Sequence, residues 1–161
     1  MKTGIKMFVG ALSAAAAICA APVQARPARA GVAAVQRAID AKFDALARDM
    51  ARGETGERIV AKLYWPEASA GVEGIPKPLT GLAELGALMQ ASVPAGTGVV
   101  CKFTQSGKLV VSGNMATSFG TASCQKPGSD KLEVSRSLHV WEKRGKQWKM
   151  IREQLAMGSY D

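Results

Sequence analysis

Four strand-like segments in succession at the C-terminal end constrain the fold most strongly. Residues 99–111, 115–124, 132–143 and 147–157 alternate in the manner of β-strands, and turn-forming sequences separate them. Strands joined by such short connections pair as antiparallel neighbours. The sequence therefore predicts an antiparallel meander of four strands, the first of which is bent or bulged at Ser106-Gly107.

Three amphipathic segments precede this meander. Residues 31–52 carry one apolar stripe at three- and four-residue steps, which predicts a helix, and the stripe consists of Val32, Val35, Ile39, Phe43, Leu46 and Met50. Residues 57–64 predict a short helix that Pro66 stops, and residues 81–91 predict a third helix capped by Thr80. A short strand is expected over residues 68–72.

Helices that precede the strands favour the α+β class. We expect the three helices to pack on one face of a strongly curved, mostly antiparallel sheet, because this arrangement hides the apolar faces of both layers. The result would be a cone-shaped α+β barrel with a pocket between the helices and the sheet.

The first 25 residues have the order of a cleavable export signal. Lys2 and Lys6 precede an Ala-rich apolar run that is too short to span a bilayer, and Pro22-Val23-Gln24-Ala25 supplies a cleavage site. An N-terminal membrane anchor is the alternative, and a lipoprotein reading of Cys19 is disfavoured by the bulky Ile18 before it. We expect a signal peptide over 1–25, a disordered lead over 26–30, one domain over 31–161, and a periplasmic or secreted location.

Two cysteines remain after cleavage, Cys101 and Cys124. An even number of cysteines in an exported domain indicates a disulfide. In an antiparallel hairpin the residue numbers of any two paired residues add up to the same total, which is twice the position of the turn. If Cys101 pairs with Cys124, the turn lies between Ser112 and Gly113, within a turn-forming sequence. The two cysteines would then face each other across the ladder at disulfide spacing.

The positive charge does not point to nucleic acid. The formal charge of +8 falls to +6 without Lys2 and Lys6, and the basic residues are spread along the chain. The densest group of basic residues spans a predicted hairpin turn and comprises Lys143, Arg144, Lys146 and Lys149. We interpret it as a solvent-exposed turn and not as a nucleic-acid-binding patch. One histidine and two bridged cysteines do not form an ordinary zinc site, and no phosphate-binding loop is present. We therefore expect no metal, no cofactor and no nucleic-acid partner.

Four segments together resemble the nuclear transport factor 2-like superfamily, which includes ketosteroid isomerase and the SnoaL-like polyketide cyclases. They are Leu63-Tyr64-Trp65-Pro66-Glu67-Ala68, Leu79-Thr80-Gly81-Leu82-Ala83-Glu84-Leu85, Val110-Val111-Ser112-Gly113-Asn114-Met115-Ala116 and residues 140–151, whose Trp141 and Trp148 flank the last turn. The resemblance covers about residues 35–155. It implies the cone fold and no particular activity.

The resemblance implies a catalytic set that this sequence does not match. The carboxylate base of the isomerases would fall on or near Val72, and the neighbouring Glu73 would point to the opposite face of a strand. The first helix offers Phe43 and no tyrosine. These differences argue against ketosteroid isomerase activity. The related dehydratases use a His–Asp pair, for which His139 is the one histidine available.

The other candidate side chains lie on the predicted strands. If the Leu and Val residues of the third strand form the core, His139 faces away from the cavity. Arg136 interrupts that apolar face and would bind an anion, or would form an ion pair. Arg152 and Gln154 are expected on the same strand face as Trp148 and Met150. Tyr64 would either pack in the core or place its hydroxyl at the cavity mouth.

Three functions fit the sequence. The first is an exported protein that binds a small apolar or weakly acidic molecule through Arg136, Tyr64, Trp148, Arg152 and Gln154. The second is a lyase or isomerase of unknown substrate that uses His139, Glu73 or Glu153 with Arg136. The third is an interaction module that forms a homodimer through the sheet, with Trp141 and His139 at the interface.

Overall fold

The computed structural model describes residues 29–160 of the 161-residue chain. The predicted signal peptide, Cys19 and residues 26–28 of the predicted lead lie outside the described residues. The elements in chain order are α1 (Arg29–Ala51), α2 (Gly56–Leu63), β1 (Tyr64–Val72), β2 (Leu79–Thr80), α3 (Gly81–Ser92), β3 (Val100–Ser112), β4 (Met115–Gln125), β5 (Leu132–Arg144) and β6 (Gln147–Met157).

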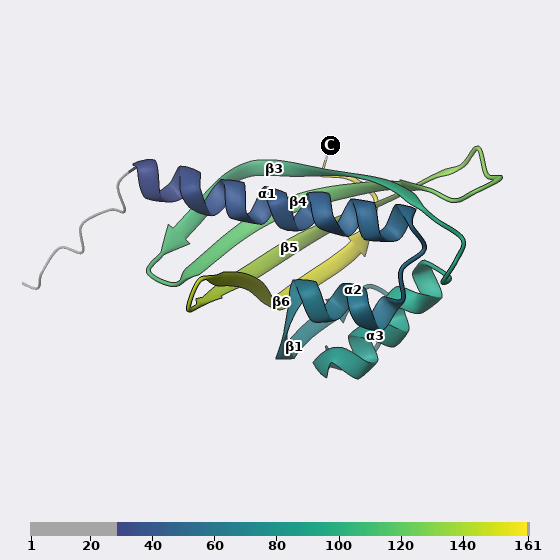
Figure 1. The fold of residues 1–161 in the computed structure, drawn as a ribbon, viewed down its shortest axis with the longest axis horizontal. Helices are drawn as coiled ribbons and strands as arrows, with labels where there is room; N and C mark the ends of the chain where they lie inside the picture. Colours follow the sequence, from purple (N-terminus) through teal and green to yellow (C-terminus); the bar gives the residue numbers. More distant parts are fainter. Residues whose placement is uncertain (1–28, 161) are drawn as a thin grey trace, which may run out of the picture.

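The strands form one six-stranded sheet with the order β2-β1-β6-β5-β4-β3. The four predicted meander strands pair antiparallel in sequence order, as expected, and β1 pairs parallel with β6. In Figure 1, α1 runs along one face of the sheet, whereas α2 and α3 lie together beside the β1 end. The three helices and the open mixed sheet therefore confirm the predicted cone-like α+β class.

The apolar stripe of α1 faces the core, as its spacing predicts. Ile39, Leu46 and Met50 are buried, and the other three members of the stripe pack against the same core. Burial of such a stripe is the main source of helix stability in a protein of this size. No helix within residues 29–160 is long and apolar enough to cross a membrane.

The helix boundaries differ from the expected ones in small ways. The helix α1 begins at Arg29, so the last two residues of the predicted lead are helical. Tyr64, expected to end the second helix, is the first residue of β1. Thr80 occupies the N-cap position of α3 without a side-chain capping hydrogen bond, and its backbone N–H donates to the Glu84 carboxylate instead.

The β3–β4 hairpin contains the predicted irregularity and shifts the predicted turn. Cys101 pairs with Cys124, but the register changes between Ser106 and Val110. The bulge absorbs extra residues in β3, so the turn lies at Gly113-Asn114 and not between Ser112 and Gly113. Gly113 has a φ of 58°, a conformation that glycine adopts without steric cost.

Candidate functional site

Three polar side chains lie in one row across the inner face of the sheet. His139 on β5 is the register partner of both Ser118 on β4 and Glu153 on β6. Residues directly opposite each other in a ladder point to the same face, so the register alone brings the three together. His139 is 5% exposed, and the Glu153 side chain is 10% exposed. The cluster is therefore almost fully removed from water.

The Glu153 carboxylate accepts hydrogen bonds from several sides. The Tyr64 hydroxyl donates to Oε2, and Nε2 of His139 lies 3.5 Å from Oε1. Ser137 also hydrogen-bonds this carboxylate. Burial alone would raise the pKa of Glu153, but the hydrogen bond and charge of His139, together with the bonds from Tyr64 and Ser137, lower that pKa below its usual value. Glu153 is therefore ionised at neutral pH.

Hydrogen bonds on the other side of the ring hold the imidazole of His139 in place. The indole N–H of Trp141 donates to Oγ of Ser118 over 3.0 Å, and this Oγ lies 3.3 Å from Nδ1 of His139. An indole nitrogen can only donate, so Ser118 accepts from it, and the hydroxyl keeps its own proton and a second lone pair to pair with Nδ1. The other ring nitrogen, Nε2, donates to Glu153.

Tyr64 remains a hydrogen-bond donor over the whole physiological pH range. Burial, followed by the nearby charge of Glu153 and the hydrogen bond to it, raises the pKa of the Tyr64 phenol well above its usual value. Its backbone N–H donates to the Val60 carbonyl at the end of α2. The junction between α2 and β1 thus holds the hydroxyl in place over the carboxylate.

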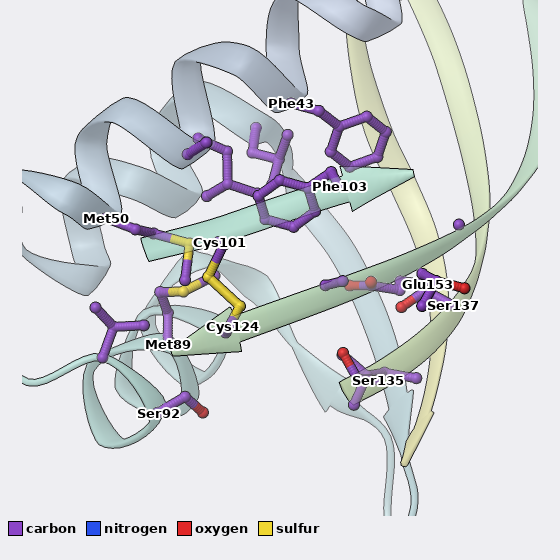
Figure 2. A pocket seen from close by; sticks show the side chains of 18 of the residues that line it. Phe43, Met50, Met89, Ser92, Cys101, Phe103, Cys124, Ser135, Ser137 and Glu153 are labelled. Atoms are coloured by element: carbon purple, nitrogen blue, oxygen red, sulfur yellow. A yellow bond between two sulfur atoms is a disulfide. The ribbon is translucent and has the colours of Figure 1, made fainter. Parts of the chain in front are cut away.

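The polar cluster forms one end of a cavity of about 570 Å³ between the helices and the sheet. Glu153, His139, Tyr64 and Ser137 all line this cavity. Figure 2 shows Glu153 and Ser137 on one side of it, with Met50, Met89 and the disulfide on the other. Most of the remaining wall is apolar, including Leu46, Val60, Leu63, Leu85, Val93, Val99, Phe103, Met150 and Leu155.

Phe43 on α1 and Gly120 on β4 shape the space around the imidazole. The Phe43 ring packs 5.2 Å from the His139 ring, between centroids, and stacks at 5.3 Å on Phe103. Gly120 also lines the cavity, and a Cβ atom there would lie 2.9 Å from Cε1 of His139. Glycine at this position therefore leaves the room that the imidazole occupies.

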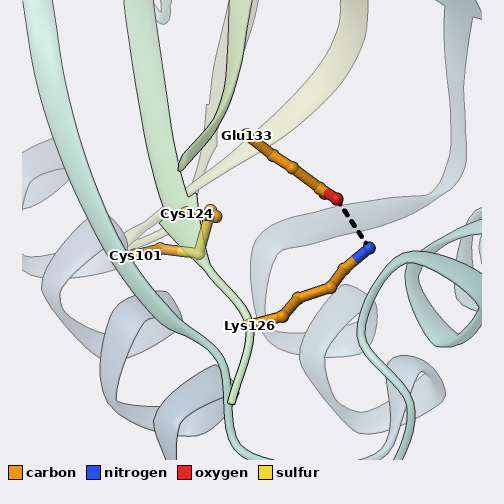
Figure 3. The surroundings of a disulfide bond; sticks show 4 residues. All are labelled: Cys101, Cys124, Lys126 and Glu133. Atoms are coloured by element: carbon orange, nitrogen blue, oxygen red, sulfur yellow. Dashed lines mark hydrogen bonds and ion pairs between the residues drawn. A yellow bond between two sulfur atoms is a disulfide. The ribbon is translucent and has the colours of Figure 1, made fainter. Parts of the chain in front are cut away.

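The predicted disulfide is present and forms part of the cavity wall. Cys101 and Cys124 are joined, with their Cα atoms 4.1 Å apart. Beside them, Lys126 and Glu133 form an ion pair of 2.9 Å across the base of the β4–β5 hairpin (Figure 3). Both side chains of this pair are 44% exposed, so this end of the cavity opens toward solvent.

The structure corrects the predicted orientation of β5. Ser137, His139 and Trp141 face inward, whereas Leu138 and Val140 lie on the opposite face and are only half-buried. The reason is that Trp141, which is 0% exposed, is the largest inward group, and Ser118 satisfies its N–H. Trp141 and His139 are therefore not surface residues of the sheet. A homodimer through the outer face, where Phe119 is exposed, stays a prediction.

A bulge in β6 corrects the predicted face of Arg152 and Gln154. The register between β5 and β6 shifts by one residue between the Trp141–Met150 and Val140–Arg152 pairs. Such a shift exchanges the two faces of a strand. Arg152 and Gln154 are consequently exposed, and neither lines the cavity with Glu153.

The other predicted site residues lie away from the cavity wall. Trp148 is buried in the core without lining the cavity. Arg136 is half-buried and donates to the Ser159 carbonyl over 3.2 Å, and Glu73 accepts from the Met157 backbone N–H over 2.7 Å. Val72, where the resemblance places a base, does line the cavity as an apolar residue. The structure thus brings together Tyr64, His139 and Glu153 from the predicted set.

The polar cluster shows no metal-binding geometry. Among residues 29–160, no three His, Cys, Asp or Glu side chains gather closely enough to hold a metal ion. Glu153 and His139 bond to hydroxyl and imidazole groups instead. The arrangement is suited to hydrogen bonding and proton transfer.

Solved structures share this architecture at low sequence identity. A ketosteroid isomerase-like protein from Erwinia carotovora atroseptica is 16% identical, with a TM-score of 0.62 over 82% of this chain and 99% of that one. Hexachlorocyclohexane dehydrochlorinase LinA-type3 from Novosphingobium barchaimii is 19% identical, with a TM-score of 0.60 over 80% and 90% of the two chains. An NTF-2 like protein of unknown function from Silicibacter pomeroyi is 13% identical, with a TM-score of 0.58 over 78% and 98%.

These similarities confirm that the chain has the nuclear transport factor 2-like fold. At such identities the likeness concerns the fold and not the activity. No protein-family model matches the chain, and no curated protein sequence matches it.

Proposed function

We propose that this protein is an enzyme that moves a proton on a small, largely apolar molecule, as a lyase or an isomerase. One observation carries the proposal: a buried carboxylate–imidazole pair, Glu153 and His139, lines an otherwise mostly apolar cavity. Ionisable groups are costly to place in such surroundings, and they gather there most often where acid–base chemistry requires them.

Glu153 is the base in this proposal. Its carboxylate takes a proton from a carbon of the bound molecule, and the C–H electron pair remains on the substrate. In a lyase reaction that pair forms a double bond and expels a leaving group from the adjacent carbon. In an isomerase reaction Glu153 returns the proton to a different carbon. Atoms and electrons balance in both reactions without a further reactant.

The neighbours of Glu153 position the carboxylate. Tyr64 and Ser137 donate to it from β1 and β5, and His139 donates from the register position opposite. A base held by several hydrogen bonds keeps one geometry, which increases the rate of a proton transfer at a fixed distance. The names of two structural relatives, an isomerase-like protein and a dehydrochlorinase, denote reactions of the same class, by analogy of fold.

A second candidate is binding without turnover, the function placed first on sequence grounds. It is favoured by the complete hydrogen bonding of the cluster, in which both nitrogens of His139 already have partners. A fully satisfied polar network can serve to fix the shape of a binding cavity.

Deuterium exchange distinguishes the two candidates. Cyclohexanone and 1-methyl-4-piperidone have acidic C–H bonds beside a carbonyl and no labile leaving group, so proton transfer appears as loss of their α-proton NMR signals in D₂O. We expect faster exchange of at least one probe with the wild type than with Glu153→Gln. Bound probe with equal exchange rates for both proteins would contradict the enzyme proposal and support binding alone.

Export remains part of the proposal. It is supported by the signal-like residues 1–25 and by a disulfide within the domain. Mass spectrometry of the full-length gene product, expressed in a Gram-negative host, should give a chain that begins at Arg26 with Cys101 and Cys124 oxidised. An uncleaved N-terminus with free thiols would contradict export.

A further inference from the structure

We infer that the molecule bound in the cavity carries a positive charge, as a protonated amine or an iminium group, near its reacting carbon. This inference rests on the proposed function, and it differs from the apolar or weakly acidic ligand expected from the sequence. The hydrogen-bond directions in the polar cluster, the balance of charge in the cavity wall and the aromatic groups of that wall support it.

The strong donors of the cluster are directed at other members of the cluster. The hydroxyl groups of Tyr64 and Ser137 and the Nε2–H of His139 point to Glu153, while the Trp141 N–H points to Ser118. Reactions that pass through an oxyanion need donors aimed at the developing charge. This cluster instead presents an acceptor, the Glu153 carboxylate, and an acceptor favours a ligand that donates or carries positive charge.

The cavity wall is acidic although the chain as a whole is basic. The full chain has a formal charge of +8. The ionisable groups that line the cavity besides His139 are four carboxylates and two lysines, namely Asp40, Asp44, Glu133, Glu153, Lys102 and Lys126. Lys126 and Glu133 neutralise each other in their ion pair.

Three carboxylates, Asp40, Asp44 and Glu153, then face Lys102 and His139 in the cavity wall. Asp40 and Asp44 are exposed at the rim on α1, whereas Glu153 is buried. Charge is screened weakly inside such a cavity, so Glu153 attracts a bound cation more strongly than the rim groups do.

Aromatic rings complete a surface suited to a cation. Phe43 and Phe103 stack on each other within the cavity wall (Figure 2). Phe43 also contacts the His139 ring. Cations bind favourably over aromatic faces, most strongly where water is excluded. An ammonium group bound in this cavity could contact these rings and the Glu153 carboxylate, which both line it, and so remain stabilised out of water.

A cationic substrate also suits the proposed reaction. Removal of a proton by Glu153 leaves an electron pair on carbon, and an adjacent ammonium or iminium group stabilises that negative charge directly. The substrate would then supply the positive charge that the polar cluster does not direct into the cavity.

Three probes of similar shape and different charge test the inference. Benzylamine is a cation at neutral pH, benzyl alcohol is neutral, and benzoate is an anion. Their dissociation constants can be measured by NMR titration of the full domain. We expect benzylamine to bind at least about tenfold more tightly than benzyl alcohol, with benzoate the weakest. Equal affinities, or tighter binding of benzoate, would overturn the inference.

Charge-neutral variants show whether Glu153 causes the preference. Glu153→Gln should abolish the advantage of benzylamine, whereas the control Glu57→Gln, on an exposed residue of α2 outside the cavity, should keep it. If Glu153→Gln does not fold, Asp44→Asn should reduce the advantage about twofold to threefold through loss of one rim charge. An unchanged preference in the folded cavity variants would contradict the inference.

The binding experiment and the exchange experiment test the cationic ligand and the enzyme activity separately. Selective binding of benzylamine, with no deuterium exchange on either ketone, would leave a cation-binding protein and contradict the enzyme. Exchange on cyclohexanone that equals or exceeds exchange on protonated 1-methyl-4-piperidone would keep the enzyme and contradict the cationic substrate.

Discussion

The two ends of the cavity are stabilised in different ways. At the polar end, Ser118, His139 and Glu153 lie on the three central strands β4, β5 and β6, and hydrogen bonds hold them together. At the opposite end, Cys101 on the edge strand β3 is linked covalently to Cys124. The polar end is nearly closed to water, whereas the disulfide end carries an exposed ion pair.

This difference suggests that the polar end carries the ligand-binding groups and that the disulfide end mainly stabilises the fold. A buried network loses much of its stability when one member is removed, because the remaining groups have lost their partners. A disulfide at a sheet edge restricts the unfolded chain and changes the native site little. We therefore expect changes at the polar end to affect both stability and ligand binding, and changes at the disulfide end to affect mainly stability.

The largest effect is expected for Glu153→Ala. Removal of the carboxylate leaves the Tyr64 hydroxyl and the Nε2–H of His139 buried without their acceptor. The free energy of unfolding should fall by about 3–5 kcal/mol in urea denaturation. A loss no greater than that of an exposed variant such as Glu57→Ala would contradict the network.

The double variant Cys101→Ala/Cys124→Ala should come next. The bond spans 23 residues, and its removal should cost about 3 kcal/mol of unfolding free energy in the chain-entropy description. The dissociation constant of benzylamine should change less than about twofold, because the polar end keeps its contacts. A loss of ligand binding in the folded variant would show that the two ends are not independent.

Ser118→Ala should have a smaller effect on stability and a specific effect on His139. The substitution leaves the buried Trp141 N–H without an acceptor and Nδ1 without its hydrogen-bond partner, at a cost of about 1–3 kcal/mol. Imidazole ¹⁵N chemical shifts, which report on each ring nitrogen separately, should show a protonated Nε2 in the wild type and a shifted Nδ1 signal in the variant. A wild-type Nε2 without a proton would contradict the hydrogen bond to Glu153.

The smallest effect is expected for Glu133→Ala at the open end. Both partners of the Lys126–Glu133 pair are 44% exposed, and such pairs contribute less than about 1 kcal/mol. The stability difference from the wild type should shrink further in high salt. A loss above 2 kcal/mol, on the order of a buried network, would mean that this end is as tightly coupled as the other.

The sequence predicts the fold better than it predicts the site. Helical periodicity on α1, the turn sequences and the Cys101–Cys124 register depend on local patterns, and these patterns were sufficient for the fold class and the disulfide. The same index-sum reasoning, applied to the turn at residues 126–130, would also have paired His139 with Ser118. That pairing identifies the neighbour that fixes the imidazole.

The face of each inner strand was harder to predict. On β5, Leu138 and Val140 suggested an apolar core face, yet the core lies on the side of Trp141 and His139. On β6, a one-residue bulge after Met150 turns Glu153 toward the cavity. Arg152, Glu153 and Gln154 are all polar, so this segment has no alternation of polar and apolar residues that would predict its inward face. A bulge depends on packing across the whole sheet, so one strand's sequence does not reveal it.

The carboxyl ¹³C signal of Glu153, assigned by its absence in Glu153→Gln, tests the central claim most directly. A lowered pKa predicts that Glu153 stays ionised while exposed carboxylates titrate, and that it gains a proton only at lower pH. The associated stability is then complete above the unfolded pKa of about 4.3 and is lost as the pH falls through the folded value. A protonated carboxyl signal at neutral pH would contradict an anionic site in the cavity.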